Sequence, residues 1–118
     1  KEHGHDKELI LGYATNDNIW LNRVAIIHQL TYKSETDMML FEDIFLRCGH
    51  KKEFFIQKAI GWALRQYSTV DANTVIQFTQ KHTLSALARR EALRKLYFSG
   101  KAFPQFTMRV KQKHNSKF

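Results

Sequence analysis

Cysteine, proline and long apolar runs are scarce in this chain of 118 residues. Its single cysteine, Cys48, excludes an internal disulfide framework and suits a reducing compartment. No apolar run approaches the roughly 18 residues of a membrane-spanning helix, and no signal-peptide pattern is visible. Because the chain begins with Lys1 rather than Met, the sequence leaves open whether a targeting segment precedes it. We expect an intracellular protein without membrane association.

Motifs for cofactors and metals are also lacking. No glycine-rich motif of the Walker or Rossmann type occurs, so we expect no nucleotide cofactor. His3 and His5 form a His-x-His pair without a third ligand in the sequence, and we expect no metal site there. Other candidates for chemistry have simpler structural interpretations. These are His28 and Cys48 as core residues, and Glu42, Asp43 and Glu53 as solvated or capping acids.

Acidic residues are few compared with basic ones. Lys and Arg number 19 against 11 Asp and Glu, which gives a net charge of +8. The excess is uneven, because Glu91 is the single acid between Lys81 and Phe118. Such asymmetry predicts a polyanionic partner, and nucleic acid is favoured because no segment pairs a bulky apolar face with a cationic one, as an acidic membrane would require. The alternative from charge alone is a solvated basic surface.

Helical periodicity recurs along the chain, whereas no segment shows convincing strand alternation. With 43% hydrophobic and 25% charged residues, the chain is able to bury a core. The pattern predicts an all-α domain over residues 1–100 and an irregular basic tail over 101–118. The predicted helices are Asp6 to Ala14, Asn16 or Asp17 to Tyr32, Asp37 to Cys48, Glu53 to Ser68, Asp71 or Asn73 to His82, and Ser85 or Ala88 to Phe98.

The predicted helix from Glu53 to Ser68 has two dissimilar faces. Its apolar stripe consists of Ile56, Ala59, Ile60, Ala63, Leu64 and Tyr67. The opposite face carries Lys58, Trp62 and Arg65, so that a tryptophan lies between two cations. A surface that binds phosphates with its cations and a base with its ring explains this arrangement. The structural alternative is a helix that is buried on two faces.

An internal repeat links this helix to an earlier one. A shift of 35 residues places residues 20–32 on residues 55–67, so that aromatic, aliphatic, amide and cationic residues coincide. Arg23 falls on Lys58 in this superposition. Paired helices with such a period predict a HEAT-like α-solenoid of antiparallel helix pairs, and the signature positions of tetratricopeptide repeats are missing. Chance similarity between two amphipathic helices is the alternative.

Three segments of the chain are similar to the C-terminal half of AlkD-like DNA alkylation repair proteins. They read NIWLNRVAI at 18–26, KEFFIQKAIGWALRQY at 52–67 and LSALARREAL at 84–93. The resemblance runs from about Asp17 to Leu96, so residues 1–100 are expected to be the C-terminal part of such a domain. It implies a HEAT-like solenoid of DNA glycosylases that release positively charged N3- and N7-alkylated purines.

The same resemblance implies roles for individual residues. Trp62 matches the tryptophan that contacts the lesion nucleotide, and Arg23 and Arg65 match arginines that hold the DNA backbone. We expect Lys58 to add a phosphate contact. Arg23 has an alternative interpretation. Its neighbours on the same helix face are Trp20, Ile27 and Leu30, which also fits a buried helix from which Arg23 extends its charged end to the surface.

The chain departs from the family at several positions. The family's catalytic aspartate lies about one repeat before the position of Arg23, so the catalytic residue is unknown here and is expected upstream of Lys1. At the last predicted helix, Ala88 replaces a capping serine, which predicts a loss of about 1 kcal/mol. The tail over residues 102–118 does not resemble the family.

Two functions follow from these patterns. Departure of an alkylated purine leaves an oxocarbenium-like sugar that a carboxylate stabilises. The chain is therefore either part of a glycosylase that binds duplex DNA and removes alkylated purines in the complete protein, or a non-catalytic scaffold that binds nucleic acid or protein within a larger assembly. RNA is the alternative polyanion. The upstream sequence, with or without the aspartate, decides between the enzyme and the scaffold.

Overall fold

Six α-helices and a short 3₁₀ helix, η1, make up residues 6–99, the part of the chain that the computed structural model describes. They are α1 (Lys7–Thr15), α2 (Ile19–Ile27), η1 (Lys33–Glu35), α3 (Met38–Cys48), α4 (Phe54–Ser68), α5 (Ala72–Lys81) and α6 (Ala86–Ser99). No strand occurs within this range, so the fold is all-α as predicted. None of the helices described here is long and apolar enough to cross a membrane. The expected tail and the pair His3 and His5 lie outside the described residues.

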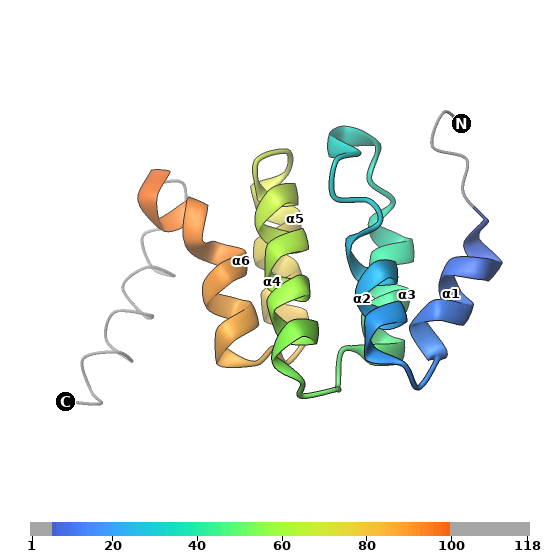
Figure 1. Ribbon diagram of the computed structural model, residues 1–118. Coiled ribbons are helices and arrows are strands. Elements are labelled where there is room, and N and C mark those ends of the chain that lie inside the picture. The colour runs from blue at the N-terminus through green and yellow to red at the C-terminus, as the bar shows by residue number, and fades with distance from the viewer. Residues whose placement is uncertain (1–5, 100–118) are drawn as a thin grey trace.

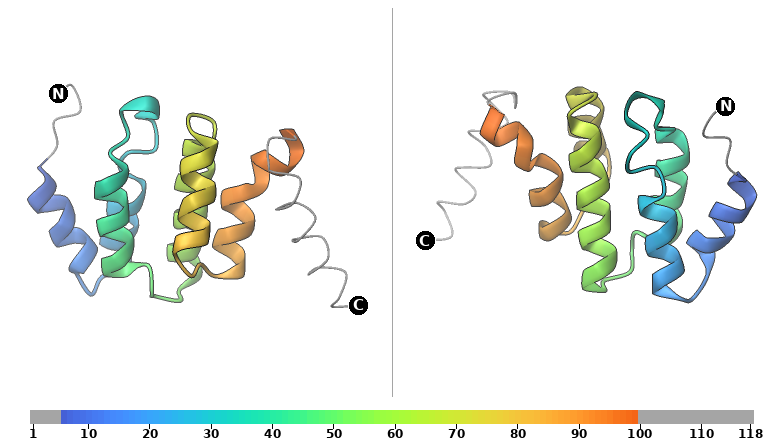
Figure 2. Two further views of the ribbon diagram at one scale, coloured as in Figure 1. Left: turned by 180° about the vertical axis from the view of Figure 1, so that it is seen from behind. Right: turned by 45° about the horizontal axis from the view of Figure 1, so that its top comes forward.

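The helices alternate in direction along the chain and form two layers (Figure 1). Helices α2, α4 and α6 run in the same direction, and α3 and α5 run in the opposite direction behind them, as the view from the back also shows (Figure 2). Helix α2 packs against α3 and α4, and α4 packs against α5 and α6. The helices that carry Trp20 and Trp62 are therefore parallel neighbours, as the repeat predicts.

Side-chain caps explain where most helices begin. Helices α1, α2, α3 and α5 start after the caps Asp6, Asn18, Asp37 and Asp71, whose side chains accept hydrogen bonds from amides in the first turn. The cap of α2 is thus Asn18 rather than the predicted Asn16 or Asp17. Helix α6 begins at Ala86, and the Ser85 hydroxyl accepts a hydrogen bond from the Ala88 amide. The predicted loss of a cap at Ala88 is therefore wrong, because Ser85 supplies it.

Helix α2 ends at Ile27, well before the predicted end at Tyr32. The Gln29 side chain explains the early end, because it binds the backbone just before α3. Its amide nitrogen donates to the Asp37 carbonyl at 3.1 Å, and its oxygen accepts from the Asp37 amide at 2.7 Å. The chain turns back through η1, where Lys33 has a φ of 55°. Helix α4 continues through Tyr67, the position that matches Tyr32, so the two helices differ in length.

Helix α4 is buried on two sides. Its predicted apolar stripe faces the core, with Ile56, Ala59, Ile60 and Leu64 buried and Ala63 and Tyr67 half-buried. A second side packs against α6 at Gly61. A Cβ atom at this glycine would lie 2.6 Å from the Glu91 Cβ and 3.1 Å from the Ala88 carbonyl oxygen. The absence of a side chain at Gly61 therefore lets the two helices approach closely.

Buried amides occupy matching positions in α2 and α4. The Asn22 side-chain nitrogen donates to the carbonyls of Tyr13, Ala14 and Asn16 at the end of α1, at 2.8–3.2 Å. The Gln57 nitrogen donates to the carbonyls of Gly49 and Lys51 after α3, at 3.0 and 2.6 Å. Each amide thus binds carbonyls at or just beyond the C-terminal end of the preceding helix. The Lys51 ammonium joins the two systems, because it donates to the Asn22 side-chain oxygen at 2.6 Å.

Candidate nucleic-acid interface

Four side chains line one face of α4 at spacings of three or four residues. They are Phe55, Lys58, Trp62 and Arg65, and such spacings place them on one side of a helix. The side chains of Lys58 and Arg65 are 48% and 27% exposed, and Trp62 is half-buried. The structure therefore brings the three predicted residues of this helix together on one accessible face. Because α4 also packs against α6 at Gly61, the structural alternative of a helix that is buried on two sides holds for the residue next to Trp62.

Arg23 continues this face on α2. The rings of Trp20 and Phe55 touch across the two helices, with centroids 5.1 Å apart. Arg23 and Lys58 each follow the contacting ring by three residues. Because α2 and α4 are parallel, these two cations lie one turn further along at a similar level. Arg23 is half-buried and borders the face formed by α4.

The Glu91 carboxylate of α6 lies among three positively charged side chains. Its carboxylate lies 3.6 Å from the Lys58 ammonium, 3.4 Å from the Arg65 guanidinium and 3.7 Å from the Arg94 guanidinium. The Glu91 side chain is only 10% exposed, whereas Lys58 and Arg94 are about half exposed. Three cations thus share one carboxylate, which leaves a local excess of positive charge. The scarcity of acids around Glu91 is visible in the sequence, whereas this clustering is not, because it joins residues of α4 and α6.

The contacts around Glu91 leave the cations available for another anion. Their lengths of 3.4–3.7 Å exceed the roughly 2.7–2.9 Å of strong charge-assisted hydrogen bonds. The Lys58 and Arg94 ends of these pairs are about half exposed, and exposed ion pairs typically contribute only about 0–1 kcal/mol, so these two cations are the ones that a phosphate engages most readily. The buried Glu91 carboxylate still requires a positive partner, because an unpaired buried charge is costly. The Arg65 Nε is buried and finds no hydrogen-bond acceptor among residues 6–99. We call Lys58, Arg65, Arg94 and Glu91 the basic cluster.

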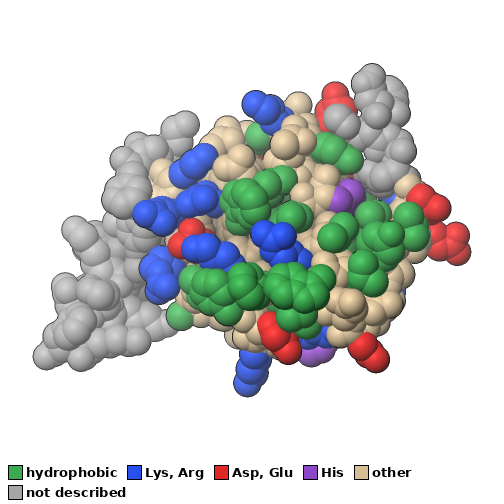
Figure 3. All heavy atoms as spheres, in the orientation of Figure 1, with side chains coloured by type: hydrophobic (Ala, Val, Ile, Leu, Met, Phe, Trp, Pro, Cys, Tyr) green, Lys and Arg blue, Asp and Glu red, His purple; other side chains and the backbone are tan. Residues whose placement is uncertain are grey.

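Exposed aromatic rings continue the face toward the N-terminal ends of α2 and α4. Trp20 is 53% and Phe55 47% exposed, and Phe54 packs edge-on against Phe55 with centroids 5.5 Å apart. Trp20 is exposed, whereas Arg23 is half-buried, so both interpretations of Arg23 stay open. Figure 3 shows this face, with hydrophobic side chains over the N-terminal ends of α2 and α4 and Lys and Arg side chains around an acidic one toward α6. The coincidence of Trp20 and Phe55 in the repeat is a signal that could have identified this pair.

The comparisons with known proteins agree with this geometry. The model of a family described as DNA alkylation repair enzyme matches residues 1–96. The chain belongs to this family. A solved structure described as a predicted DNA alkylation repair enzyme from Enterococcus faecalis is similar to it, with 37% sequence identity and a TM-score of 0.71 over 76% of the chain. The match spans 43% of the length of that protein. No curated protein matches the chain.

Membership of the DNA alkylation repair family supports a role in DNA repair. The remaining candidate residues of the chain lie away from the face of α2, α4 and α6. Glu42 of α3 binds Lys81 and His82 of α5 at 2.9 and 2.6 Å, so it is paired rather than solvated. Hydrogen bonds from Lys81 and then His82 hold the pKa of Glu42 below its usual value. Asp43 pairs with Arg47 at 2.9 Å, and Glu53 is exposed at the start of α4.

Of the two remaining predicted core residues, Cys48 is fully buried as expected, whereas His28 is only half-buried. The Cys48 thiol is buried and donates weakly to the Ile44 carbonyl at 3.5 Å, and burial raises its pKa to about 11. A thiol of this kind is a poor nucleophile at neutral pH. His28 is half-buried and its Nδ1 lies 2.8 Å from the Ala25 carbonyl oxygen. Within the described part of the chain, no group of three His, Cys, Asp or Glu side chains is placed to hold a metal ion.

Proposed function

We propose that this chain is the C-terminal part of a HEAT-like DNA glycosylase solenoid. It binds duplex DNA through the face of α2 and α4, and in the complete protein it helps to release positively charged N3- and N7-alkylated purines. The observation that carries the proposal is the stripe of Phe55, Lys58, Trp62 and Arg65, with more cations around it than Glu91 neutralises. Family membership supports the same conclusion.

The residues of this face have separate tasks in the proposed mechanism. Lys58, Arg65 and Arg23 neutralise phosphates on either side of the lesion and set the register of the duplex. The Trp62 ring offers its negative face to the cationic base, an interaction of about 0.5–2 kcal/mol depending on desolvation.

The carboxylate that stabilises the sugar is expected in the segment before Lys1. Glu91 is the acid closest to the proposed face, but three cations already share its charge. A carboxylate held in this way orients Lys58 and Arg65 rather than facing a developing positive charge. This chain alone therefore binds DNA without excising bases in our proposal.

DNA binding is tested by the salt dependence of the affinity of this chain for a duplex. Neutralisation of several phosphates predicts a steep fall of log K with log salt, and each lost contact should reduce the slope by about one. Arg65→Ala should flatten the slope, whereas the control Arg47→Ala should leave it unchanged. Arg47 pairs with Asp43 on α3, in the other layer. A slope near zero for the unmodified chain would refute DNA binding.

Excision is tested by base release from methylated DNA, with this chain and with the complete protein. The complete protein should release N3- or N7-methylpurines, and the chain alone should not. In the complete protein, Trp62→Ala should slow excision more than it weakens binding, and Arg65→Ala should impair both. Excision by the chain alone would show that the catalytic acid lies within it.

The second candidate is a non-catalytic scaffold, which the exposed rings of Trp20, Phe54 and Phe55 favour. An apolar surface of this kind suits a protein partner or an unpaired base. A complete protein that binds DNA or a partner but releases no base would establish the scaffold.

A further inference from the structure

The two helix pairs enclose a cavity on the side where α2 ends early. Its volume is about 270 Å³, and it lies between the connection that follows α2 and the C-terminal half of α4. The cavity arises because α2 stops at Ile27 whereas the matching helix α4 continues to Ser68. The turn that replaces the end of α2 leaves a space that a further helical turn would occupy. This site is separate from the face of Lys58, Trp62 and Arg65.

The wall of the cavity combines apolar and polar side chains. Phe41 of α3 and Ala63 and Leu64 of α4 contribute to it, and none of the lining residues is acidic. Cavities of about 150 Å³ accept benzene, and sites for drug-sized ligands begin near 300 Å³. A volume of about 270 Å³ therefore fits a single ring with one substituent.

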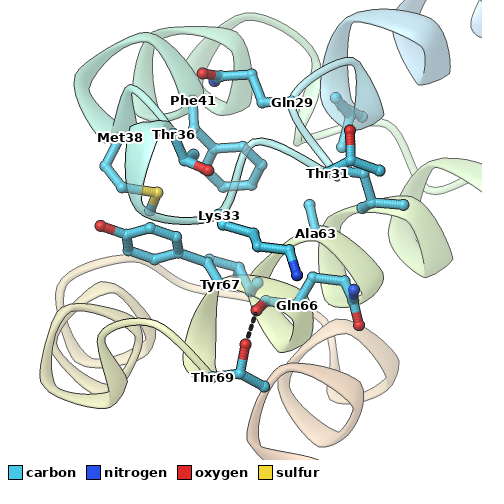
Figure 4. A pocket seen from close by; sticks show the side chains of 13 residues that line it. Gln29, Thr31, Lys33, Thr36, Met38, Phe41, Ala63, Gln66, Tyr67 and Thr69 are labelled. Carbon is cyan, nitrogen blue, oxygen red and sulfur yellow. Dashed lines mark hydrogen bonds between the residues drawn. The ribbon is translucent and has the colours of Figure 1, made fainter.

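A cation lies across this cavity. Figure 4 shows the Lys33 side chain extending between Phe41 on one side and Tyr67 and Gln66 on the other, with its ammonium group directed toward α4. Among residues 6–99, Lys33 takes part in no ion pair. Its φ of 55° is a conformation that a residue with a side chain rarely adopts, and strained positions of this kind cluster at ligand sites.

Two further polar groups face the same space. Tyr67 and Gln66 line the cavity from the last turns of α4 (Figure 4). Burial, with a smaller effect from Asp71, raises the pKa of the Tyr67 phenol, which therefore remains a neutral hydrogen-bond donor at physiological pH. The Gln66 amide supplies another donor beside the ammonium group. An anionic substituent at the Lys33 ammonium would thus find the Gln66 amide beside it, whereas the Tyr67 hydroxyl lies at the other end of the cavity, beside Met38 (Figure 4).

We infer that this cavity is a binding site for a small organic anion, a single aromatic ring that carries one carboxylate or phosphate. The ring lies against Phe41, Ala63 and Leu64, and the anionic group accepts hydrogen bonds from the Lys33 ammonium and from the Gln66 amide beside it. Such a ligand bridges the connection after α2 and the end of α4, and so it links the two helix pairs. The inference is independent of the proposed excision chemistry, because the base released by a glycosylase of alkylated purines is not an anion.

The test is a titration of the isotope-labelled chain followed by amide NMR shifts. Benzoate is the probe, benzamide tests the charge on the same ring, and acetate tests the charge without the ring. Benzoate should shift the amides of Lys33, Gln66 and Tyr67, with at least tenfold weaker binding of benzamide and acetate. Equal binding of benzamide or acetate, or shifts confined to other residues, would overturn the inference.

A pair of lysine substitutions tests whether the anion binds the Lys33 ammonium group. Lys33→Met should weaken benzoate binding about tenfold, in the range of one charge-assisted hydrogen bond, whereas the control Lys52→Met should not. Lys52 is exposed and lies outside the cavity. Ala63→Leu fills the apolar wall and provides an independent test, because it should also reduce binding. Unchanged affinity in both Lys33→Met and Ala63→Leu would refute the site.

Competition distinguishes a small-molecule site from an extension of the DNA surface. A saturating short duplex should leave benzoate bound, because the cavity is separate from the basic cluster. Displacement of benzoate by the duplex would show that the anion site serves DNA and would overturn the inference of a small-molecule ligand.

Discussion

The contact between α4 and α6 at Gly61 makes a sharp prediction about stability. A Cβ atom at this position would meet the Glu91 Cβ at 2.6 Å and the Ala88 backbone at 3.1 and 3.3 Å. These atoms belong to the backbone of α6 or are attached directly to it, so rotation of a flexible side chain cannot relieve the contact. Gly61→Ala must therefore move the two helices apart, and with them the carboxylate that holds Lys58 and Arg65.

The magnitude follows from two opposing effects. Insertion of a methyl group into a well-packed contact costs about 1–3 kcal/mol, and a contact with α6 this close favours the upper part of that range. Replacement of glycine by alanine in a helix interior stabilises the folded state by about 0.5–1 kcal/mol, because alanine has the higher helix propensity. The net expectation for Gly61→Ala is a loss of about 1–2 kcal/mol in the free energy of unfolding. In a domain of this size, that loss lowers the Tm by about 4–16 °C.

The assay is thermal and urea unfolding followed by circular dichroism, with Gly12→Ala as the matched control. Gly12 lies within α1, and a Cβ atom there meets nothing within 4 Å. The control should therefore gain about 0.5–1 kcal/mol from helix propensity alone. The same substitution is expected to have opposite signs at the two glycines. A Gly61→Ala variant at least as stable as the unmodified chain would refute the close packing of α4 on α6.

Three further outcomes are expected. Glu91→Gln should tighten binding to a duplex and steepen its salt dependence, since a negative charge is removed from the basic cluster; weaker binding would contradict the proposed DNA face. The Cys48 thiol, with a pKa of about 11, should react with an aromatic disulfide at pH 8 only after denaturation, and rapid reaction of the native chain would contradict its burial. Glu42→Gln should reduce the free energy of unfolding at pH 7. Because the folded-state pKa of Glu42 lies below its ordinary value of 4.5, its contribution is present above that pH and is lost as the pH falls through the lowered value. Urea unfolding at pH 7 and pH 3 measures this difference, and an equal deficit at both values would exclude the ion pair as its source.

Local signals were sufficient to predict most of the helices. Periodicity and capping residues predict α3 and α5, for example, because Asp37 and Asp71 cap them in the structure. The end of α2 was not predictable in this way. It depends on hydrogen bonds between the Gln29 side chain and the backbone of Asp37, a contact that helix periodicity does not reveal. Similarly, Ser85 and Ala88 were both candidates for the start of α6, and the hydrogen bond of the Ser85 hydroxyl decides between them.

The candidate site was predictable to the extent that it lies on one helix. Lys58, Trp62 and Arg65 share a face because of their spacing in the sequence, and the structure places them on it. Their partner Glu91 comes from another helix, and its position depends on the close approach at Gly61. The exposure of Trp20 likewise depends on how α2 packs against its neighbours. The spacing of residues within α4 therefore predicts which side chains share the face. The packing of α6 against α4 determines which charges surround them.

The reach of Lys51 has a consequence for how the molecule unfolds. This lysine lies in the connection between the two helix pairs, yet its ammonium group binds the Asn16 carbonyl at 3.0 Å and the Asn22 side chain at 2.6 Å, both at the start of the first pair. Its own carbonyl accepts the Gln57 amide of the second pair. A stack of helix pairs without such a link can fray one pair at a time from its end. Here the opening of either pair breaks hydrogen bonds that connect it to the other, so amide exchange in α2 and α4 should reach a common, global opening free energy.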